Sequence, residues 1–199
     1  LGLHQRRRAI FAAPSFAQLP WYADHPTDPD VRQESHFLHA VLPSVEKDFP
    51  ARREPNGRLL LGFSKSGWGA FSLLLRHPNL FGKAAAWDAP LMMERPGRYG
   101  SGPIFGTPAN FEGYRLTRLV EKDGRSLGES PRLIHLGRGN FQAEHAAFER
   151  LMTNLGVPHR HLDGPVREHR WESGWLSEAV EALLPTDPNA PKSAADQAR

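Results

Sequence analysis

The fold is decided by the stretch Arg58-Leu59-Leu60-Leu61-Gly62-Phe63-Ser64-Lys65-Ser66-Gly67-Trp68-Gly69-Ala70-Phe71-Ser72-Leu73-Leu74-Leu75. An apolar run of strand length ends in a glycine, and a leucine-rich pattern of helical spacing follows within a few residues. This order is typical of a nucleophile elbow, the strained strand-to-helix turn that holds a serine above a parallel sheet. The small residues that such a turn needs are Gly62, Ser66 and Gly67. Because Ser66 stands where the strict motif has glycine, the match is G-x-S-x-S-G with Ser64 at its centre.

Two other interpretations of the same stretch are open. Glycine-rich strand-to-helix loops also bind phosphate, but Trp68-Gly69 stands where a P-loop has lysine and serine or threonine, and the G-x-G-x-x-G pattern is absent from the sequence. A purely structural turn needs only a serine, Ser64 or Ser66, as the cap of the helix. The rest of the chain has to decide between a nucleophile and a structural turn.

Length and composition limit the class of protein. The 199 residues are enough for one domain with a substantial core. The absence of cysteine excludes disulfides, a thiolate nucleophile and cysteine zinc sites. A net charge of +3, with basic residues scattered among acidic ones, predicts no nucleic-acid partner. No apolar run reaches membrane-span length, so we expect no membrane partner, and the oligomeric state stays open.

The beginning of the chain has no hydrophobic region followed by a small-residue cleavage site, and no initiator methionine. The compartment therefore stays open between the cytoplasm and export with the targeting segment absent from this chain. The pattern of Leu1–Arg8 is that of the end of a helix, and Ala9–Ala13 has the pattern of a short buried strand before Pro14. A start in mid-helix predicts a chain that is truncated at its N-terminus.

Strand and helix patterns alternate along the rest of the chain. The first expected helix opens at Asp28-Pro29-Asp30 and places one apolar face on a sheet, made of Phe37, Leu38, Val41, Leu42 and Val45. The expected strands are 58–62, 83–87, 132–136 and 159–162. A helix to residue 76 follows the first of these strands, an irregular segment 91–130 follows the second, a helix that buries Phe148 follows the third, and a helix with Trp175 and Val180 on its apolar face closes the domain. This succession predicts an α/β fold with a mostly parallel sheet and helices on both faces. We expect one domain over 1–184 with a cap-like insertion at about 91–130, and a disordered tail over 185–199.

Three residues with reactive side chains follow predicted strands. Ser64 comes after the central strand 58–62, Asp88 after the next strand 83–87, and His169 lies in the loop after the last. Ligands of open parallel sheets bind at the carboxyl ends of the strands. The chain order serine, aspartate, histidine is also the order found in hydrolases whose serine sits on an elbow. Order and placement together favour a serine triad over a structural turn.

The segment from about Trp21 to Leu184 resembles the esterase group of α/β-hydrolases that includes esterase D, feruloyl esterase and tributyrin esterase-like proteins. The residues that carry the resemblance are Trp21-Tyr22, Gly62-Phe63-Ser64-Lys65-Ser66-Gly67-Trp68-Gly69-Ala70, Leu75-Arg76-His77-Pro78-Asn79-Leu80-Phe81 and Glu168-His169-Arg170-Trp171. The resemblance implies an α/β-hydrolase sheet, Ser64 as nucleophile, His169 as general base, a carboxyl or acyl ester of a small molecule as substrate, and no cofactor.

One departure from this family concerns the acid of the triad. The family pattern has a Gly-x-x-Asp turn after the strand that here is 132–136, but this chain has Asn140 at the aspartate position. Asparagine carries no charge to stabilise an imidazolium, and in one serine protease the Asp-to-Asn change lowers the rate by about four orders of magnitude. We therefore predict Asp88 as the acid, with Asn140 as the alternative position. If neither serves, the enzyme is weak or inactive.

A second departure concerns the oxyanion hole. One donor is the backbone N–H after the nucleophile, which Lys65 can supply, and the other comes from a loop after an early strand. Nothing in residues 1–13 resembles that loop. Either it lies upstream of Leu1 in a longer protein, or the loop 16–21 substitutes for it. The loss of one donor costs about two to three orders of magnitude in turnover.

The remaining candidates concern the substrate wall and metal binding. Trp21, Tyr22 and Trp68 are candidates for an aromatic wall beside the acyl group, and packing in the core is the competing interpretation. His159 and His161 share one face of a strand, but no carboxylate or third imidazole stands at ligand spacing, so we predict no metal site. The alternative to an esterase is a non-catalytic binding or regulatory module that keeps the elbow as architecture. Acyl transfer to an alcohol acceptor is a further possibility within the same chemistry.

Overall fold

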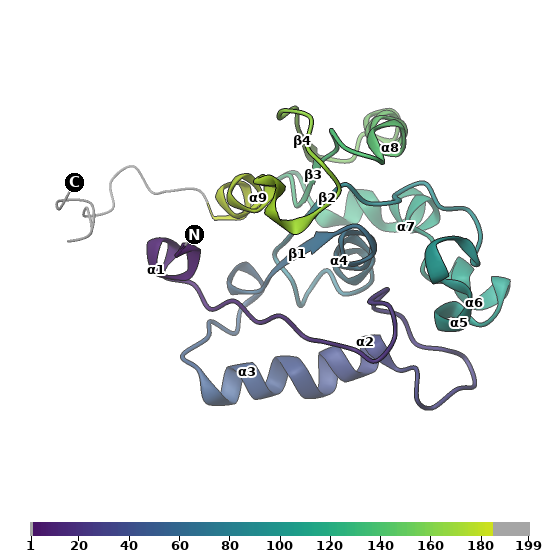
Figure 1. The fold of residues 1–199 in the computed structure, drawn as a ribbon, viewed down its shortest axis with the longest axis horizontal. Coiled ribbons are helices and arrows are strands. Elements are labelled where there is room, and N and C mark those ends of the chain that lie inside the picture. The colour runs from purple at the N-terminus through teal and green to yellow at the C-terminus, as the bar shows by residue number, and fades with distance from the viewer. Residues whose placement is uncertain (1, 185–199) are drawn as a thin grey trace.

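The computed structural model of the chain describes residues 2–184 and centres on four parallel strands (Figure 1). The strands are β1 (Leu59–Phe63), β2 (Lys83–Trp87), β3 (Leu133–Leu136) and β4 (His159–Leu162), and they lie side by side in the order β1-β2-β3-β4. Phe63 pairs with Trp87, and Trp87 pairs with Leu136. The last residues of the first three strands are therefore neighbours, which brings the loops that follow them to one edge of the sheet. The described region has the predicted α/β-hydrolase-like fold.

Helices cover both faces of this sheet. The α-helices of residues 2–184 are α1 (Leu3–Arg7), α2 (Gln33–His36), α3 (Leu42–Asp48), α4 (Lys65–Arg76), α5 (Gly102–Phe105), α6 (Pro108–Glu112), α7 (Leu116–Asp123), α8 (Gln142–Leu155) and α9 (Trp175–Leu183). The side chains of β2 alternate: Ala84 and Ala86 pack in one core cluster with α4, α7 and α8, whereas Ala85 and Trp87 pack in another with α9. A strand that is apolar on both faces is typical of a buried parallel sheet.

The helix after the elbow is the central helix of the fold. From Gly67 to Leu75 every residue of α4 is buried, and the helix ends before Pro78, whose ring disfavours helical backbone at the preceding residue. Gly69 allows the close approach of the N-terminal loop, because a Cβ at this position would lie 2.6 Å from the Tyr22 ring. The predicted strand–elbow–helix unit is thus the core of the molecule.

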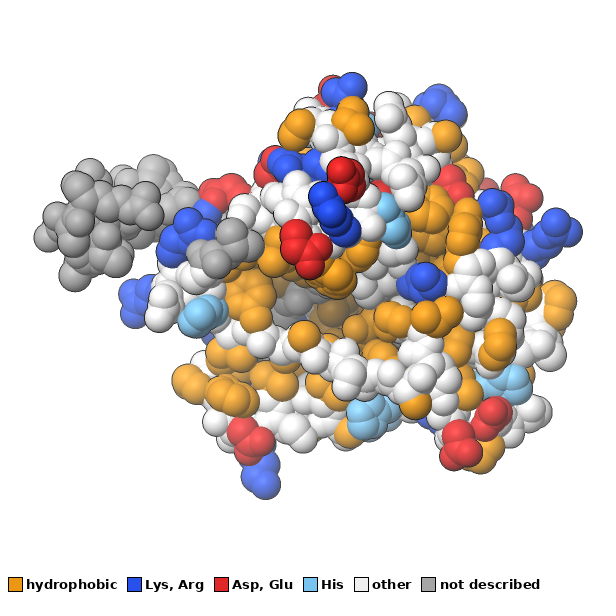
Figure 2. All heavy atoms as spheres, in the orientation of Figure 1, with side chains coloured by type: hydrophobic (Ala, Val, Ile, Leu, Met, Phe, Trp, Pro, Cys, Tyr) orange, Lys and Arg blue, Asp and Glu red, His pale blue; other side chains and the backbone are white. Residues whose placement is uncertain are grey.

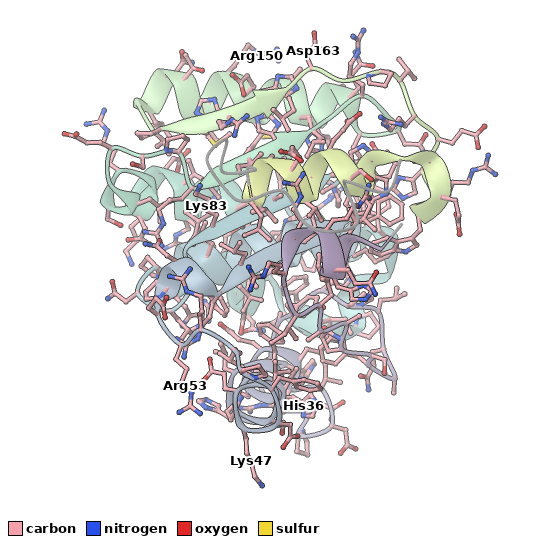
Figure 3. The ribbon with its side chains drawn as sticks, turned by 90° about the vertical axis from the view of Figure 1, so that its left-hand side faces the viewer. His36, Lys47, Arg53, Lys83, Arg150 and Asp163 are labelled. Carbon is pink, nitrogen blue, oxygen red and sulfur yellow. The ribbon has the colours of Figure 1, made fainter. Side chains whose placement is uncertain are left out.

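The helical layer next to β1 differs in detail from the prediction. It begins at Gln33 rather than at Asp28, and a wide π-helical turn over Phe37–Val41 joins α2 to α3. Pro43 follows this turn and has no N–H to donate, which explains a break in the regular hydrogen-bond pattern there. In Figure 3 the labelled His36 and Lys47 place α2 and α3 at one end of the molecule, with Arg150 of α8 at the opposite end.

The predicted strand at Ala9–Ala13 was wrong. These residues follow α1 as an extended arm without strand pairing, and Ile10 and Phe11 are 43% and 47% exposed. The apolar pattern is real, but the arm has no strand beside it, and a cavity separates it from β1. An apolar run becomes a strand only when another edge pairs with it.

The segment 91–130 contains three short helices, α5 to α7. Leu116 and Val120 of α7 are buried in the same cluster as α4, and so are Phe105 of α5 and Phe111 of α6. Figure 1 shows α5 and α6 beyond α7, away from the sheet. A cap role for the segment remains a prediction. The predicted tail over 185–199 and residue 1 lie outside the described residues. Within 2–184, no helix combines the length and the apolar character that crossing a bilayer requires.

Candidate active site

Ser64 sits on a strained turn between β1 and α4. Its backbone has φ 54° and ψ −121°, a conformation that non-glycine residues rarely adopt, and its N–H donates to the Trp87 carbonyl oxygen at 3.0 Å. Gly62 makes the turn possible, because a Cβ there would lie 2.0 Å from the Ser66 carbonyl oxygen. Ser64 itself is only 9% exposed. The strain costs about 1–3 kcal/mol and is typical of functional sites.

Asp88 is the buried acid of the site. It follows β2, it is 0% exposed, and its φ of 43° is also in the left-handed region. Its two carboxylate oxygens accept hydrogen bonds from the backbone N–H groups of Asn140 at 3.0 Å and Phe141 at 2.7 Å. Gly139 leaves room for this arrangement, since a Cβ at that position would lie 2.5 Å from the carboxyl group. The turn after β3 therefore holds the carboxylate with backbone amides.

His169 joins the other two residues. Its Nδ1 lies 2.6 Å from Asp88 Oδ2, and its Nε2 lies 3.1 Å from Ser64 Oγ. A carboxylate only accepts hydrogen bonds, so Nδ1 is the protonated nitrogen and Nε2 presents its lone pair to the serine hydroxyl. The ring packs against Phe63, with centroids 4.5 Å apart, and against Phe141 at 5.6 Å. The structure thus brings Ser64, His169 and Asp88 into one hydrogen-bonded chain.

Asn140 occupies a different place from the acid position that the family pattern suggests. Its backbone N–H donates to Asp88, whereas the imidazole contacts Asp88 itself. The chain therefore keeps a carboxylate beside the histidine by supplying it from the β2 loop. The β3 loop contributes the amides that hold this carboxylate.

The two predicted sources of oxyanion-hole donors, the Lys65 amide and the loop 16–21, differ in whether their N–H groups already have acceptors. Lys65 is the first residue of α4, and its N–H is one of those that a helix leaves without an intrahelical acceptor. The loop 16–21 is engaged elsewhere, because the N–H groups of Trp21 and Tyr22 both donate to Gln33 Oε1. That loop therefore does not offer the amide of Trp21 as a second donor.

The predicted aromatic wall was mostly wrong. Trp21 and Trp68 are 0% exposed and pack edge to face on each other, with centroids 5.5 Å apart, so they belong to the core and not to a substrate surface. Tyr22, the third candidate for the wall, is half-buried, and this burial raises the pKa of its hydroxyl to about 12. The aromatic residues near His169 are instead Phe63, Phe141 and the half-exposed Trp171, whose ring lies 5.2 Å from that of Phe63. The sequence signal for Trp171 was its place two residues after His169.

A chain of buried histidines lies behind Asp88 and was not foreseen. The N–H of Ala89 donates to His145 Nε2 at 2.9 Å, His145 Nδ1 lies 3.1 Å from His135 Nδ1, and His135 Nε2 lies 2.7 Å from Glu149 Oε2. A backbone amide only donates, so His145 Nε2 is an acceptor and the hydrogen bonds of the neutral rings all run one way. His145 Nδ1–H donates to His135, and His135 Nε2–H donates to Glu149. The available signal was the spacing of His145 and Glu149, which places both on one face of α8.

Burial keeps the two inner rings of this chain neutral. Burial, reinforced by His161, lowers the pKa of His135 to about 4. Burial and the neighbouring His135 also hold the pKa of His145 well below its ordinary value. Partial burial raises the pKa of Glu149, but the hydrogen bonds of His159 and His135 outweigh it and lower the pKa overall. The network is therefore two neutral rings that end on a carboxylate.

The end of this network is the one place within residues 2–184 where three possible metal ligands converge. His135, Glu149 and His159 offer atoms within 4.8 Å of one another. The sequence spacing of His159 and His161 did not indicate that a carboxylate and a further imidazole lie beside His159. The proton order imposed by the Ala89 amide, however, places a hydrogen on His135 Nε2, and a protonated nitrogen does not ligate a metal. The donor set in this arrangement does not fit a metal ion.

Comparison with known proteins agrees with this fold. Residues 12–125 match the family described as "Putative esterase". Esterase Rv1288 of Mycobacterium tuberculosis (strain ATCC 25618 / H37Rv) is 22% identical, and the match covers 78% of this chain and 41% of that protein. The chain thus spans less than half the length of this curated relative.

Solved structures show the same architecture. FphF, a fluorophosphonate-binding serine hydrolase of Staphylococcus aureus, superposes with a TM-score of 0.68 at 17% identity, covering 84% of this chain and 68% of that one. A ferulic acid esterase gives a TM-score of 0.60 at 23% identity, covering 81% and 64%. At these identities the likeness concerns the fold alone. The family match, which extends over more than half of the sequence, shows that the chain belongs to the family described as "Putative esterase".

Proposed function

We propose that this protein is a serine esterase that cleaves a carboxylic ester through an acyl-enzyme. The observation that carries the proposal is the hydrogen-bonded chain from Ser64 Oγ through His169 to the buried Asp88. Membership of an esterase family supports the same chemistry. A serine on a strained elbow, an imidazole in the correct tautomer and a carboxylate held by two amides are the parts that nucleophilic acyl transfer needs.

The proposed reaction has two steps. His169 Nε2 takes the proton of Ser64 Oγ as this oxygen attacks the ester carbonyl carbon, and Asp88 stabilises the imidazolium through Nδ1. The Lys65 amide donates to the developing oxyanion. His169 then gives the proton to the leaving alcohol. In the second step water attacks the acyl group with His169 as base, which releases the acid and restores Ser64.

The substrate of this reaction is a small-molecule ester. The rings of Phe63 and Phe141 lie beside His169, and the ring of Trp171 lies beside Phe63; such rings suit an apolar acyl or aryl group. The name of the ferulic acid esterase among the structural neighbours agrees with an aromatic acyl group, although that name describes the neighbour. The nucleophile, the general base, the acid and the oxyanion donor of this reaction are side chains and a backbone amide of the chain, and the co-reactant of the second step is water.

A fluorophosphonate probe tests the proposal directly. The intact protein should be labelled on Ser64, as mapped by mass spectrometry of the adduct, and should hydrolyse a p-nitrophenyl ester. Ser64→Ala should lose both labelling and turnover. Ser44→Ala, an exposed serine on α3, is the matched control and should keep both. Folded protein that takes up no label, or label that persists in Ser64→Ala, would refute the proposed nucleophile.

The second candidate is a non-catalytic binding module with the architecture of a hydrolase. It is favoured by one observation: the amides of Trp21 and Tyr22 are occupied by Gln33, so neither of them is available as the second donor of the oxyanion hole. This candidate predicts that the intact, folded protein takes up no fluorophosphonate label and turns over no ester. Measured turnover that Ser64→Ala abolishes would exclude it.

A further inference from the structure

The segment that carries His169 has no regular structure of its own. Residues 163–170 connect β4 to the 3₁₀ turn Trp171–Ser173 that precedes α9, and they belong to no helix or strand. Within residues 2–184, this segment makes one backbone hydrogen bond to main chain outside 163–173: the N–H of Arg167 donates to the Arg138 carbonyl oxygen at 2.9 Å. A segment with so few backbone bonds depends on its side chains for a fixed path.

The side chain of Arg167 gives a second connection, to the start of α9. Its Nη1 donates to the Ser173 carbonyl oxygen at 2.6 Å, and its Nη2 donates to a carboxylate oxygen of Glu178. Only 18% of the Arg167 side chain is exposed. Gly174 makes room for it, because this residue has a φ of 95° and a Cβ there would lie 2.6 Å from Nη1. The guanidinium is therefore held between a carbonyl and a carboxylate.

Arg167 thereby links the parts that position the acid and the base. Its backbone partner Arg138 lies in the turn after β3, and the backbone amides of the same turn hold the Asp88 carboxylate. Its side-chain partners lie at α9, which packs on the sheet through the buried ring of Trp175. His169 follows two residues later and must meet both Asp88 and the serine hydroxyl. One side chain and one amide thus fix the segment on two sides.

The other charged residues of the segment are poor anchors. Glu168 and Arg170 pair with each other, and both side chains are mostly exposed. Asp163 pairs with Arg138 at 3.3 Å, and it too is mostly exposed. Figure 2 shows acidic and basic side chains close together on the surface over the segment before α9. Exposed pairs of this kind contribute little because water screens them, so Arg167 is the main anchor of the segment.

We propose that Arg167 is a positioning residue for the base of the site, and that it fixes segment 163–170 so that the His169 ring reaches Ser64 and Asp88 at the same time. The guanidinium donates to Ser173 and Glu178, so it acts through the path of the segment and not on the ester. For its effect on turnover the inference rests on the function proposed above. A displacement of about 1 Å at a reacting group can cost about two orders of magnitude in rate.

The experiment replaces Arg167 by methionine in the full chain, which keeps an unbranched side chain and removes the guanidinium. In hydrolysis of a p-nitrophenyl ester, kcat should fall at least tenfold with KM within twofold. The low-field proton resonance of His169 Nδ1, recorded by NMR without ester, should broaden or shift. Arg167→Lys keeps the charge but has one nitrogen for two acceptors, so its kcat should lie between those of Arg167→Met and the unchanged protein. Arg170→Met is the matched control, since it removes only an exposed pair, and kcat and the resonance should stay as they are.

A second variant keeps the test independent of the folding of Arg167→Met. Glu178→Gln keeps the size of the side chain but removes the charge beside the guanidinium, and it should lower kcat at least threefold. In Arg167→Met/Glu178→Gln, kcat should lie within twofold of Arg167→Met alone, because the same contact is already lost. Circular dichroism will show that each variant is folded at the assay temperature.

Three results would overturn the inference: a folded Arg167→Met with kcat within twofold and an unchanged resonance, an equal loss in Arg170→Met, or a loss confined to KM, which would make Arg167 a substrate-binding residue. If the unchanged protein turns over no ester, the proposed esterase function fails instead. The resonance of His169 in the variants then still decides the role of Arg167, because it is recorded without ester.

Discussion

Replacing His145 by leucine tests whether the buried histidine chain positions the acid of the site. The ring of His145 accepts the N–H of Ala89, the residue directly after Asp88. Asp88 itself has a φ of 43°, a strained conformation that persists only when its surroundings enforce it. His145→Leu puts an apolar side chain of similar size in place of the imidazole and so removes both ring nitrogens.

The expected magnitudes follow from the groups left without a partner. Ala89 N–H and His135 Nδ1 are both buried, and each unsatisfied group costs about 1–3 kcal/mol. A total of about 2–6 kcal/mol lies within the range of about 5–15 kcal/mol that a domain of this size has available. Relaxation of the Asp88 turn would release about 1–3 kcal/mol of strain. If the displaced carboxylate loses a similar amount of its stabilisation of the imidazolium, about 1–3 kcal/mol, kcat falls roughly 5- to 160-fold.

The assay separates positioning from a loss of folding. Steady-state hydrolysis of a p-nitrophenyl ester should show a lower kcat with KM nearly unchanged, because His145 does not line the substrate approach. The low-field proton resonance of the hydrogen bond between His169 Nδ1 and Asp88 should broaden or shift. His145→Gln is the matched control, since its amide oxygen can accept from Ala89 and its NH₂ can donate to His135. The reasoning fails if folded His145→Leu keeps kcat within twofold, or if His145→Gln loses as much activity as His145→Leu.

Three further predictions concern the turn beside the acid, a buried ion pair and acid stability. Gly139→Ala should lower kcat at least tenfold in a folded protein, because the new Cβ would lie 2.5 Å from the Asp88 carboxyl group, and steady-state kinetics will measure the loss. Glu34→Gln should reduce the free energy of unfolding by about 3–5 kcal/mol in urea titrations, because Glu34 is 5% exposed and pairs with Arg76. Burial lowers the pKa of His135 to about 4, below its ordinary value of about 6.5. The unfolded chain therefore binds this proton first, and on the order of 3 kcal/mol of stability, fully present above pH 6.5, should be lost as the pH falls toward 4.

Controls for these predictions come from positions without the same contacts. Gly102→Ala adds a methyl group whose nearest neighbour is a Gly97 atom at 3.6 Å, an ordinary contact, so kcat should stay within twofold. Glu121→Gln changes an exposed carboxylate on α7 and should alter stability by less than about 0.5 kcal/mol. His135→Gln removes the titrating ring and should flatten the pH dependence of unfolding between pH 6.5 and 4. An unchanged slope in this variant would refute the assignment to His135.

The sequence was informative wherever the signal is local. The strand, elbow and helix around Ser64 follow from residues that are adjacent in the chain, and the succession of β1 to β4 along the chain follows from alternating strand and helix periodicities. Asp88 and His169 were predicted from their place after strands, because parallel strands end at a common edge. Their hydrogen bonds with each other depend on the path of the loop 163–170, which carries no periodic signal.

The misses all depend on contacts between distant segments. The arm Ala9–Ala13 has the composition of a strand but lacks a paired neighbour, which composition cannot reveal. Trp21 and Trp68 lie 47 positions apart in the chain, and only the fold brings their rings together in the core. The network of His135, His145 and Glu149 exists because α8 folds back over β3, and ten histidines scattered along a sequence do not indicate which of them meet.

The hydroxyl of Ser66 has a consequence for how far the sheet can extend. It fills both outward backbone positions of Phe63, so the ladder along β1 closes one residue before the nucleophile. The elbow therefore holds its own last strand residue, and the turn that carries Ser64 is braced by a side chain from the first turn of α4. Glycine at this position, as in the strict motif, would leave both backbone groups of Phe63 without this side-chain partner.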